Sequence, residues 1–192
     1  MASLSLSALS FVVISCSLSP TSKSAILAEH AATFLKQDGY SVDFIDLRTV
    51  TLPFCNGINN SAYDHPSVKD LHDRILKADG IILSSPIYNY SVSASCKNLF
   101  ELTDTRYLDK LSGKAWKEKV VGFIGQSGSP KSLMAPLSFF GSLILDARAT
   151  IVPHFVMSSP EDFEGEIPSP LILDRLKKLT TETIRYTIAL KQ

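Results

Sequence analysis

The chain has 192 residues, of which 45% are hydrophobic and 20% are charged, and 19 basic side chains balance 19 acidic ones. This length and composition predict one globular domain over residues 1–192, with enough apolar side chains for a sizeable core. A formal net charge of +0 without a basic cluster argues against nucleic acid as a partner, and no stretch approaches the about 20 apolar residues of a membrane span.

The three cysteines, Cys16, Cys55 and Cys96, lie far apart and have no closely spaced histidines. They fit neither a disulfide framework nor a zinc site, so we expect no metal site and a reducing cytoplasm. Residues 13–16 resemble a lipoprotein cleavage site, which leaves export open as an alternative. Signal peptides begin with a positively charged region, whereas the first basic residue here is Lys23.

Apolar runs typical of strands alternate with patterns typical of helices along the chain. Strands are predicted at 11–14, 42–45, 80–83, 119–125 and 149–156, and helices at 25–37, 67–78, 93–102, 133–145 and 172–190. Five such units predict an α/β fold in which helices cover both faces of a parallel sheet. The irregular segments 51–66 and 157–170 are expected to form lids, subunit contacts or mobile regions.

The segment 15–24 carries six hydroxyl side chains between the first predicted strand and the first predicted helix. Hydroxyls donate to phosphate oxygens, and a helix N-terminus adds unpaired N–H groups and the positive end of its dipole. The segment therefore predicts a phosphate pocket built on side-chain O–H groups rather than on glycines. A serine-rich connection with a single N-cap is the alternative. The candidate ligands are Ser17, Ser19, Thr21, Ser22, Lys23 and Ser24.

The segment 84–93, after the third predicted strand, combines two tyrosines, an amide and a rigid proline. Such a set suits a flat aromatic ligand, because the rings can stack and the amide both donates and accepts. The alternative is that both tyrosines cap the core. The candidate ligands are Pro86, Ile87, Tyr88, Asn89, Tyr90 and Ser91.

The segment 125–130, after the fourth predicted strand, is small and polar, and its glycines let a backbone approach a ligand closely. An ordinary turn is the alternative. Ligands of open α/β sheets bind outside the carboxyl ends of the strands, so the three segments are expected to meet at one edge. The candidate ligands are Gln126, Ser127, Gly128 and Ser129.

Together the three segments resemble those of the NADPH-dependent FMN reductase family of flavodoxin-like proteins. The matching motifs are 17–24, 86–91 followed by Lys97-Asn98, and 127–129. The resemblance implies a flavodoxin-like three-layer sandwich with five parallel strands in the order 2-1-3-4-5. It also implies that the first loop holds the phosphate of FMN and that the other two hold its isoalloxazine ring.

The chain departs from the family pattern at Cys16, where many relatives carry glycine, and at Ser19, where many carry arginine. The phosphate then has less fixed positive charge beside it, which leaves Lys23 and the helix N-terminus to attract it. We expect Cys16 to be a buried spacer, with an activated thiol near the helix as the alternative.

The implied activity is hydride transfer from NADPH to FMN and on to a small acceptor, in which the cofactors carry the chemistry. We predict no catalytic side chain, because the histidines are scattered and no Ser, Cys, Asp and His set is convincing. The alternatives are a quinone or azo reductase with tightly held FMN and a flavin-binding electron carrier without turnover. An NAD-binding domain with Asp46 on the ribose is a further alternative, although the glycine fingerprint is missing.

Cofactor preference and assembly follow from the resemblance alone. It implies NADPH selectivity and a homodimer or homotetramer. Candidate partners of the 2′-phosphate are Arg106, Lys110 and Lys131. Phe139, Phe140 and Leu145 are available for a subunit contact, although core packing explains them equally well.

Overall fold

The computed structural model describes residues 9–57, 61–104 and 114–191. Its strands are β1 (Ser10–Ser15), β2 (Ser41–Asp46), β3 (Gly80–Tyr88), β4 (Ser91–Val92), β5 (Val120–Ser127), β6 (Thr150–Ile151), β7 (Val156–Ser158), β8 (Phe163–Glu164) and β9 (Ile167–Pro168). Its helices are α1 (Lys23–Gln37), α2 (Pro66–Lys77), α3 (Ala94–Thr103), α4 (Leu137–Leu145) and α5 (Pro170–Leu190), with short 3-10 turns η2 (Leu47–Thr49), η4 (Pro130–Ser132) and η5 (Pro160–Asp162).

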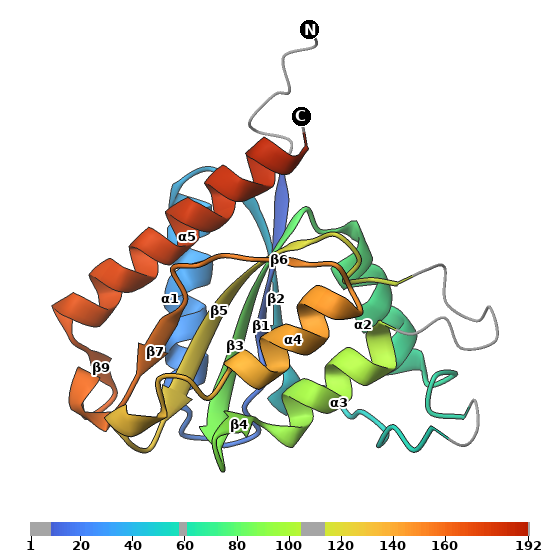
Figure 1. The fold of residues 1–192 in the computed structure, drawn as a ribbon, viewed down its shortest axis with the longest axis horizontal. Coiled ribbons are helices and arrows are strands. Elements are labelled where there is room, and N and C mark those ends of the chain that lie inside the picture. Colours follow the sequence, from blue (N-terminus) through green and yellow to red (C-terminus); the bar gives the residue numbers. More distant parts are fainter. Residues whose placement is uncertain (1–8, 58–60, 105–113, 192) are drawn as a thin grey trace, which may run out of the picture.

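The central sheet has the strand order β2-β1-β3-β5-β6, and these strands run parallel. The short β7 also pairs with β5 in parallel, whereas β4 pairs with β3 in the antiparallel direction. Helices lie on both faces, so the molecule has three layers (Figure 1). The structure therefore confirms the predicted flavodoxin-like α/β sandwich and its strand order.

Alternation of side chains along the strands divides the core into two clusters. Phe11 and Val13 of β1 pack on the face covered by α1 and α5, whereas Val12 and Ile14 pack against α2, α3 and α4. Successive residues of a strand point to opposite faces, so a sheet buried on both faces needs apolar residues at consecutive positions. This is why the central strands read as continuous apolar runs.

Strands β3 and β5 extend past the carboxyl ends predicted for them, to Tyr88 and Ser127. β3 continues through residues 84–88, and its pairing with β5 reaches Ile87 opposite Ser127. The second predicted loop is therefore a hairpin between β3 and β4, with Asn89 at φ 50° and Tyr90 at φ 61° at its tip. The left-handed region costs energy for a side chain as bulky as tyrosine, which marks this tip as strained.

The fifth predicted strand, 149–156, is two short strands, β6 and β7. Pro153 lies between them and has no N–H to donate to the ladder. The predicted helix 133–145 begins only at Leu137, after η4. The segment 157–170 contains η5 and the β8–β9 hairpin rather than irregular chain.

Candidate functional site

The first loop joins the carboxyl end of β1 to the start of α1. Ser22 is the N-cap of α1, and its Oγ accepts from the N–H of Ala25 at 3.1 Å and lies 3.0 Å from Ser24 Oγ. Ser17 Oγ accepts from the N–H of Ser19 at 3.2 Å. The alternative to a phosphate pocket was a serine-rich connection with a single N-cap. Capping explains Ser22, but it does not explain the other hydroxyls of the loop.

Several donors at this loop have no hydrogen-bond partner within the described ranges. They include the backbone N–H groups of Leu18, Thr21 and Ser22, and the hydroxyl of Ser15, which is 0% exposed. Ser15 lies in register with Ser84, whose Oγ donates to the carbonyl of Ser24 at 2.8 Å. Residues in register share a face of the sheet, so Ser15 faces the first turn of α1. Buried polar groups are normally satisfied, so the Ser15 hydroxyl is the unusual member of this set, whereas Leu18 and Thr21 are exposed residues. Together with N–H groups before a helix, such a hydroxyl is suited to an anion.

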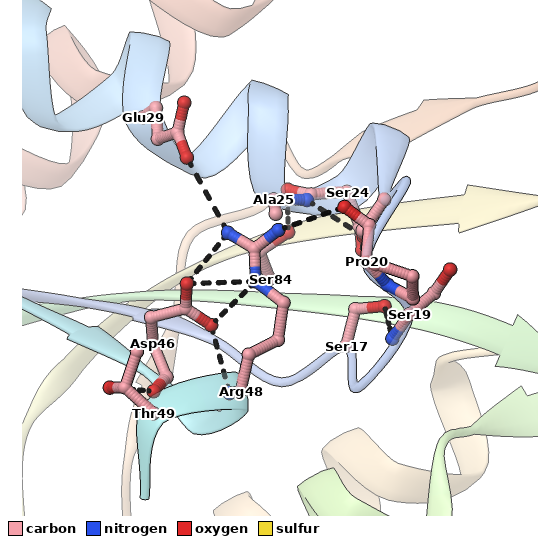
Figure 2. Close-up of polar contacts among 11 residues, drawn as sticks. Ser17, Ser19, Pro20, Ser24, Ala25, Glu29, Asp46, Arg48, Thr49 and Ser84 are labelled. Atoms are coloured by element: carbon pink, nitrogen blue, oxygen red, sulfur yellow. Dashed lines mark hydrogen bonds and ion pairs between the residues drawn. The ribbon is translucent and has the colours of Figure 1, made fainter.

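The cations near the loop are Lys23 and Arg48. The ammonium of Lys23 lies 4.8 Å from the ring centroid of Phe163, at the β8–β9 hairpin. Arg48, in η2, donates through Nη1 to the carbonyl of Pro20 at 3.3 Å (Figure 2). Sequence reasoning missed Arg48 because it applied the strand-end rule to the first, third and fourth strands and not to the second.

Asp46 ends β2 and holds Arg48 in place. The Nε of Arg48 lies 3.0 Å and 2.8 Å from the two carboxylate oxygens of Asp46, whose Oδ1 also accepts from the N–H of Arg48. Partial burial raises the pKa of Asp46, but the hydrogen bonds and charge of Arg48 outweigh burial and leave the pKa below its ordinary value. Asp46 thus stays ionised and supports the turn that ends its strand.

The hairpin after β3 presents its two tyrosines to solvent. Tyr88 is 57% exposed and Tyr90 is 69% exposed, so neither caps the core. Asn89 is also exposed, whereas Pro86 and Ile87 are buried, and Ile87 belongs to the core cluster. The side chains of Pro86 and Ile87 are therefore not accessible to a ligand, whereas the tyrosine rings are accessible to a planar molecule.

The polar side chains of Gln126 and Ser127 in the third segment form hydrogen bonds with carbonyl groups of the protein itself. Ser127 Oγ lies 2.6 Å from the carbonyl of Ser129 and 3.2 Å from that of Ser158, and Gln126 Nε2 donates to the carbonyl of Ser127 at 2.9 Å. Gly128 is exposed with open space where a Cβ would stand. We infer that this segment offers a ligand its main chain more than its hydroxyls.

Hydrogen bonds join the first two segments at the carboxyl edge of the sheet, the lower edge in Figure 1, and the pairing of β3 with β5 places the third segment beside the second. The N–H of Cys16 donates to the carbonyl of Ser84 at 2.8 Å, and Ser95 Oγ donates to the carbonyl of Cys16 at 2.5 Å. Ser85 Oγ accepts from the N–H of Ser93 at 3.0 Å and so ties the hairpin to α3. Sequence reasoning missed these bracing serines, because serine in a strand and serine at a ligand look alike in a sequence.

Cys16 is fully buried between the first loop and α3. Burial raises the pKa of its thiol well above the ordinary value, and the neighbouring Cys96 adds to the shift. A thiol with a raised pKa stays protonated at neutral pH, so Cys16 behaves as the expected spacer rather than as an activated nucleophile.

The remaining candidates lie elsewhere. Arg106 and Lys110 are outside the described residues, and Lys131 is exposed in η4. Phe139 and Phe140 are buried in the core, whereas Leu145 is 84% exposed. Within the described ranges, no group of three or more His, Cys, Asp or Glu side chains is placed to hold a metal ion, and no helix has the length and apolar content to cross a membrane.

A family model described as NADPH-dependent FMN reductase matches residues 9–164. The chain belongs to this family. It is therefore an oxidoreductase that works with NADPH and FMN. The donors at the first loop fit the cofactor of the family, since the Ser15 hydroxyl and the N–H groups just before α1 have no partner among the described residues and a phosphate accepts from such donors.

Known proteins resemble this member of the FMN reductase family over nearly its whole length. The chain is 25% identical to the NAD(P)H-dependent FAD/FMN reductase of Geobacillus thermodenitrificans, over 88% of this chain and 89% of that protein. It is 28% identical to the NADPH:quinone oxidoreductase of Arabidopsis thaliana, over 93% of this chain and 91% of that protein. The structure of FerB, a flavoenzyme NAD(P)H:(acceptor) oxidoreductase from Paracoccus denitrificans, matches with a TM-score of 0.75 at 19% identity, covering 94% of this chain and 98% of that one.

Proposed function

We propose that the carboxyl edge of the sheet binds FMN, with its phosphate in the loop 17–24 and its ring between the segments 86–91 and 126–129. The observation that carries this proposal is the set of donors at the first loop that find no acceptor in the described part of the chain, above all the buried hydroxyl of Ser15. The exposed rings of Tyr88 and Tyr90 support the second part, because they stand where a planar ring system can contact them.

Bound FMN supplies a ring that accepts a hydride from NADPH and gives electrons to an acceptor. The protein binds and orients that ring and needs no acid or base of its own. Ser22 and Ser24 help to shape the first turn of α1, whose N–H groups face the phosphate. Main-chain groups of Asn89 and Gly128 lie at the ring end, and Gly128 has open space where a side chain would stand.

We propose a small planar acceptor. The hairpin tyrosines are open to solvent, so a second ring can stack above the flavin site without displacing core residues. The candidates are free flavin, azo dyes and quinones, because relatives named for each of them match the chain at 25%, 29% and 28% identity. A tightly held FMN would point to the quinone or azo reductase reading, and a weakly held one to transfer onto free flavin.

We propose a homodimer or homotetramer in the cytoplasm. The α4 region exposes apolar side chains that a second copy would cover: Leu133, Met134, Leu137, Ile144 and Leu145. The three free cysteines suit a reducing compartment. Size-exclusion chromatography with light scattering tests the assembly, and a monomer at micromolar concentration would contradict it.

The visible spectrum of the purified protein with added FMN, followed by NADPH in air, tests the proposed function. We expect the flavin spectrum to shift on binding and NADPH to be consumed only when FMN is present. Flavin binding without NADPH consumption would favour the electron-carrier reading. No interaction with FMN would overturn the assignment of the site.

A further inference from the structure

A guanidinium group lies behind the first loop although the loop itself contains no arginine. Arg48 lies 28 residues from Pro20 in the sequence, yet its Nη1 donates to the Pro20 carbonyl at 3.3 Å. Figure 2 shows its side chain reaching from η2 across to the loop. The turn that follows β2 is thereby hydrogen-bonded to the middle of the loop 17–24, which we propose as the phosphate site.

The position of Arg48 is determined by several contacts at once. Its Nη2 lies 2.6 Å from Asp46 Oδ2, and its Nε bonds both oxygens of the same carboxylate. The Nη2 also lies 3.7 Å from Glu29 Oε1 on α1, and the side chain is only 27% exposed. A planar guanidinium has its donors in a rigid fork, so these partners leave it one orientation.

The bond to Pro20 orients a peptide of the loop. Peptide bonds of the described residues are trans, so the N–H of Thr21 points opposite to the carbonyl of Pro20. With that carbonyl held by Arg48, the N–H of Thr21 points away from the guanidinium. This N–H has no acceptor among the described residues and is therefore available to a ligand.

Charge alone does not explain the arrangement. Arg48 contributes one positive charge, and Asp46 and Glu29 together contribute two negative charges, so the trio carries a formal charge of about −1. Such a group does not attract a phosphate by its net charge. A role in orienting the loop is the stronger explanation of its place there.

We propose that Arg48 is a positioning residue for the phosphate of FMN, which aligns the Pro20–Thr21 peptide so that the N–H of Thr21 can bind a phosphate oxygen. The inference rests on the proposed function, since it assumes that the loop 17–24 receives the phosphate.

Paired affinities for FMN and riboflavin test this role, because riboflavin lacks only the phosphate. In the whole protein we expect R48A to weaken FMN binding at least tenfold and to change riboflavin binding less than twofold, measured by flavin fluorescence titration. R48K keeps the charge but cannot bridge Pro20 and both oxygens of Asp46, so we expect an intermediate loss.

Arg74 provides a matched control. It forms a similar paired contact with Asp43 of β2, at 2.7 Å to each oxygen, but comes from α2 and does not touch the first loop. We expect R74A to leave both affinities unchanged. Thermal unfolding without flavin shows whether each variant is folded. If R48A is not folded, R48K tests the role instead: a loss of FMN affinity larger than the loss of riboflavin affinity supports positioning, and equal changes contradict it.

A double variant separates positioning from charge. R48A/D46N removes the guanidinium together with its main counter-charge, and we expect the loss of FMN affinity to persist. Recovery of FMN affinity in the double variant, or an equal loss of FMN and riboflavin affinity in R48A, would overturn the positioning role. If the wild-type protein binds riboflavin as tightly as FMN, the phosphate site itself fails, which is a different outcome.

Discussion

Hydroxyl groups at the carboxyl edge of the sheet serve two different purposes. Those of Ser84, Ser93 and Ser127 are engaged with the protein itself and hold the loops in place. The hydroxyl of Ser15 is buried with no partner among residues 9–57, 61–104 and 114–191, and it lies on the side of α1. At the scale of single residues, hydrogen-bond partners distinguish hydroxyls that stabilise the fold from the hydroxyl that is a candidate for binding a ligand. The distinction is useful because a buried polar group left unpaired is costly.

Asp104, at the end of α3, is a buried carboxyl with an incomplete set of partners. Its Oδ1 accepts from the N–H of Trp116 at 3.2 Å, whereas its Oδ2 has no hydrogen-bond partner in the described chain. Lys114 lies 3.8 Å away but is also paired with Asp146. Burial raises the pKa of Asp104 to about 6, against the lowering influence of the Trp116 N–H and of Lys114.

This raised pKa predicts a pH-dependent cost in stability. Between about pH 4 and pH 6 the unfolded chain loses the Asp104 proton while the folded protein keeps it, so its contribution to the free energy of unfolding falls as the pH rises. We expect the free energy of unfolding of D104N, relative to that of the wild type, to rise by about 2 to 3 kcal/mol from pH 4 to pH 8, measured by urea unfolding. A difference between the two proteins that does not change with pH would contradict this prediction.

At the scale of elements, strand β5 and helix α5 approach each other closely at Gly122. A Cβ there would lie 2.5 Å from Thr183 Oγ1 and 2.7 Å from Ile82 Cδ1. Thr183 is buried and donates to the carbonyl of Leu179, so it cannot easily turn away. The glycine therefore sets how near the helix lies to the sheet.

We expect G122A to lower the free energy of unfolding by about 1 to 3 kcal/mol, because the added methyl group overpacks this contact. Chemical denaturation measures the change. G141A is the matched control, since Gly141 lies within α4 with open space around it and alanine is the better helix former. Equal stability of the two variants would show that α5 can move away without cost.

The sequence predicted which elements exist better than where they end. Periodicity revealed each central strand and helix, because burial on one or both faces imposes it. Residues 84–88 are polar and contain proline, which predicts a loop, but pairing with β1 at Ser84 and with β5 as far as Ile87 keeps them in strand β3. The split of the fifth strand depends on the way Pro153 breaks the pairing with β5, and no local pattern shows that pairing.

At the scale of the whole molecule, we propose that residues 1–192 unfold as one domain, because the two core clusters share the same central sheet. One cooperative thermal transition is expected, measured by circular dichroism. FMN at 100 times its dissociation constant should stabilise the fold by about 2.7 kcal/mol and raise the midpoint by roughly 5 to 10 °C. Two separate transitions, or a midpoint that does not respond to FMN, would contradict this expectation.

The sequence by itself determined the alternation of strands and helices, the three loops at one edge of the sheet and the likeness to the FMN reductase family. These are local properties, because periodicity and turn residues act over a few positions. Only the tertiary structure decided which hydroxyls are engaged, that Ile87 is buried and that Arg48 contacts the loop across 28 residues of sequence. Such contacts depend on strand order and register, which bring together side chains whose separation in the sequence carries no signal.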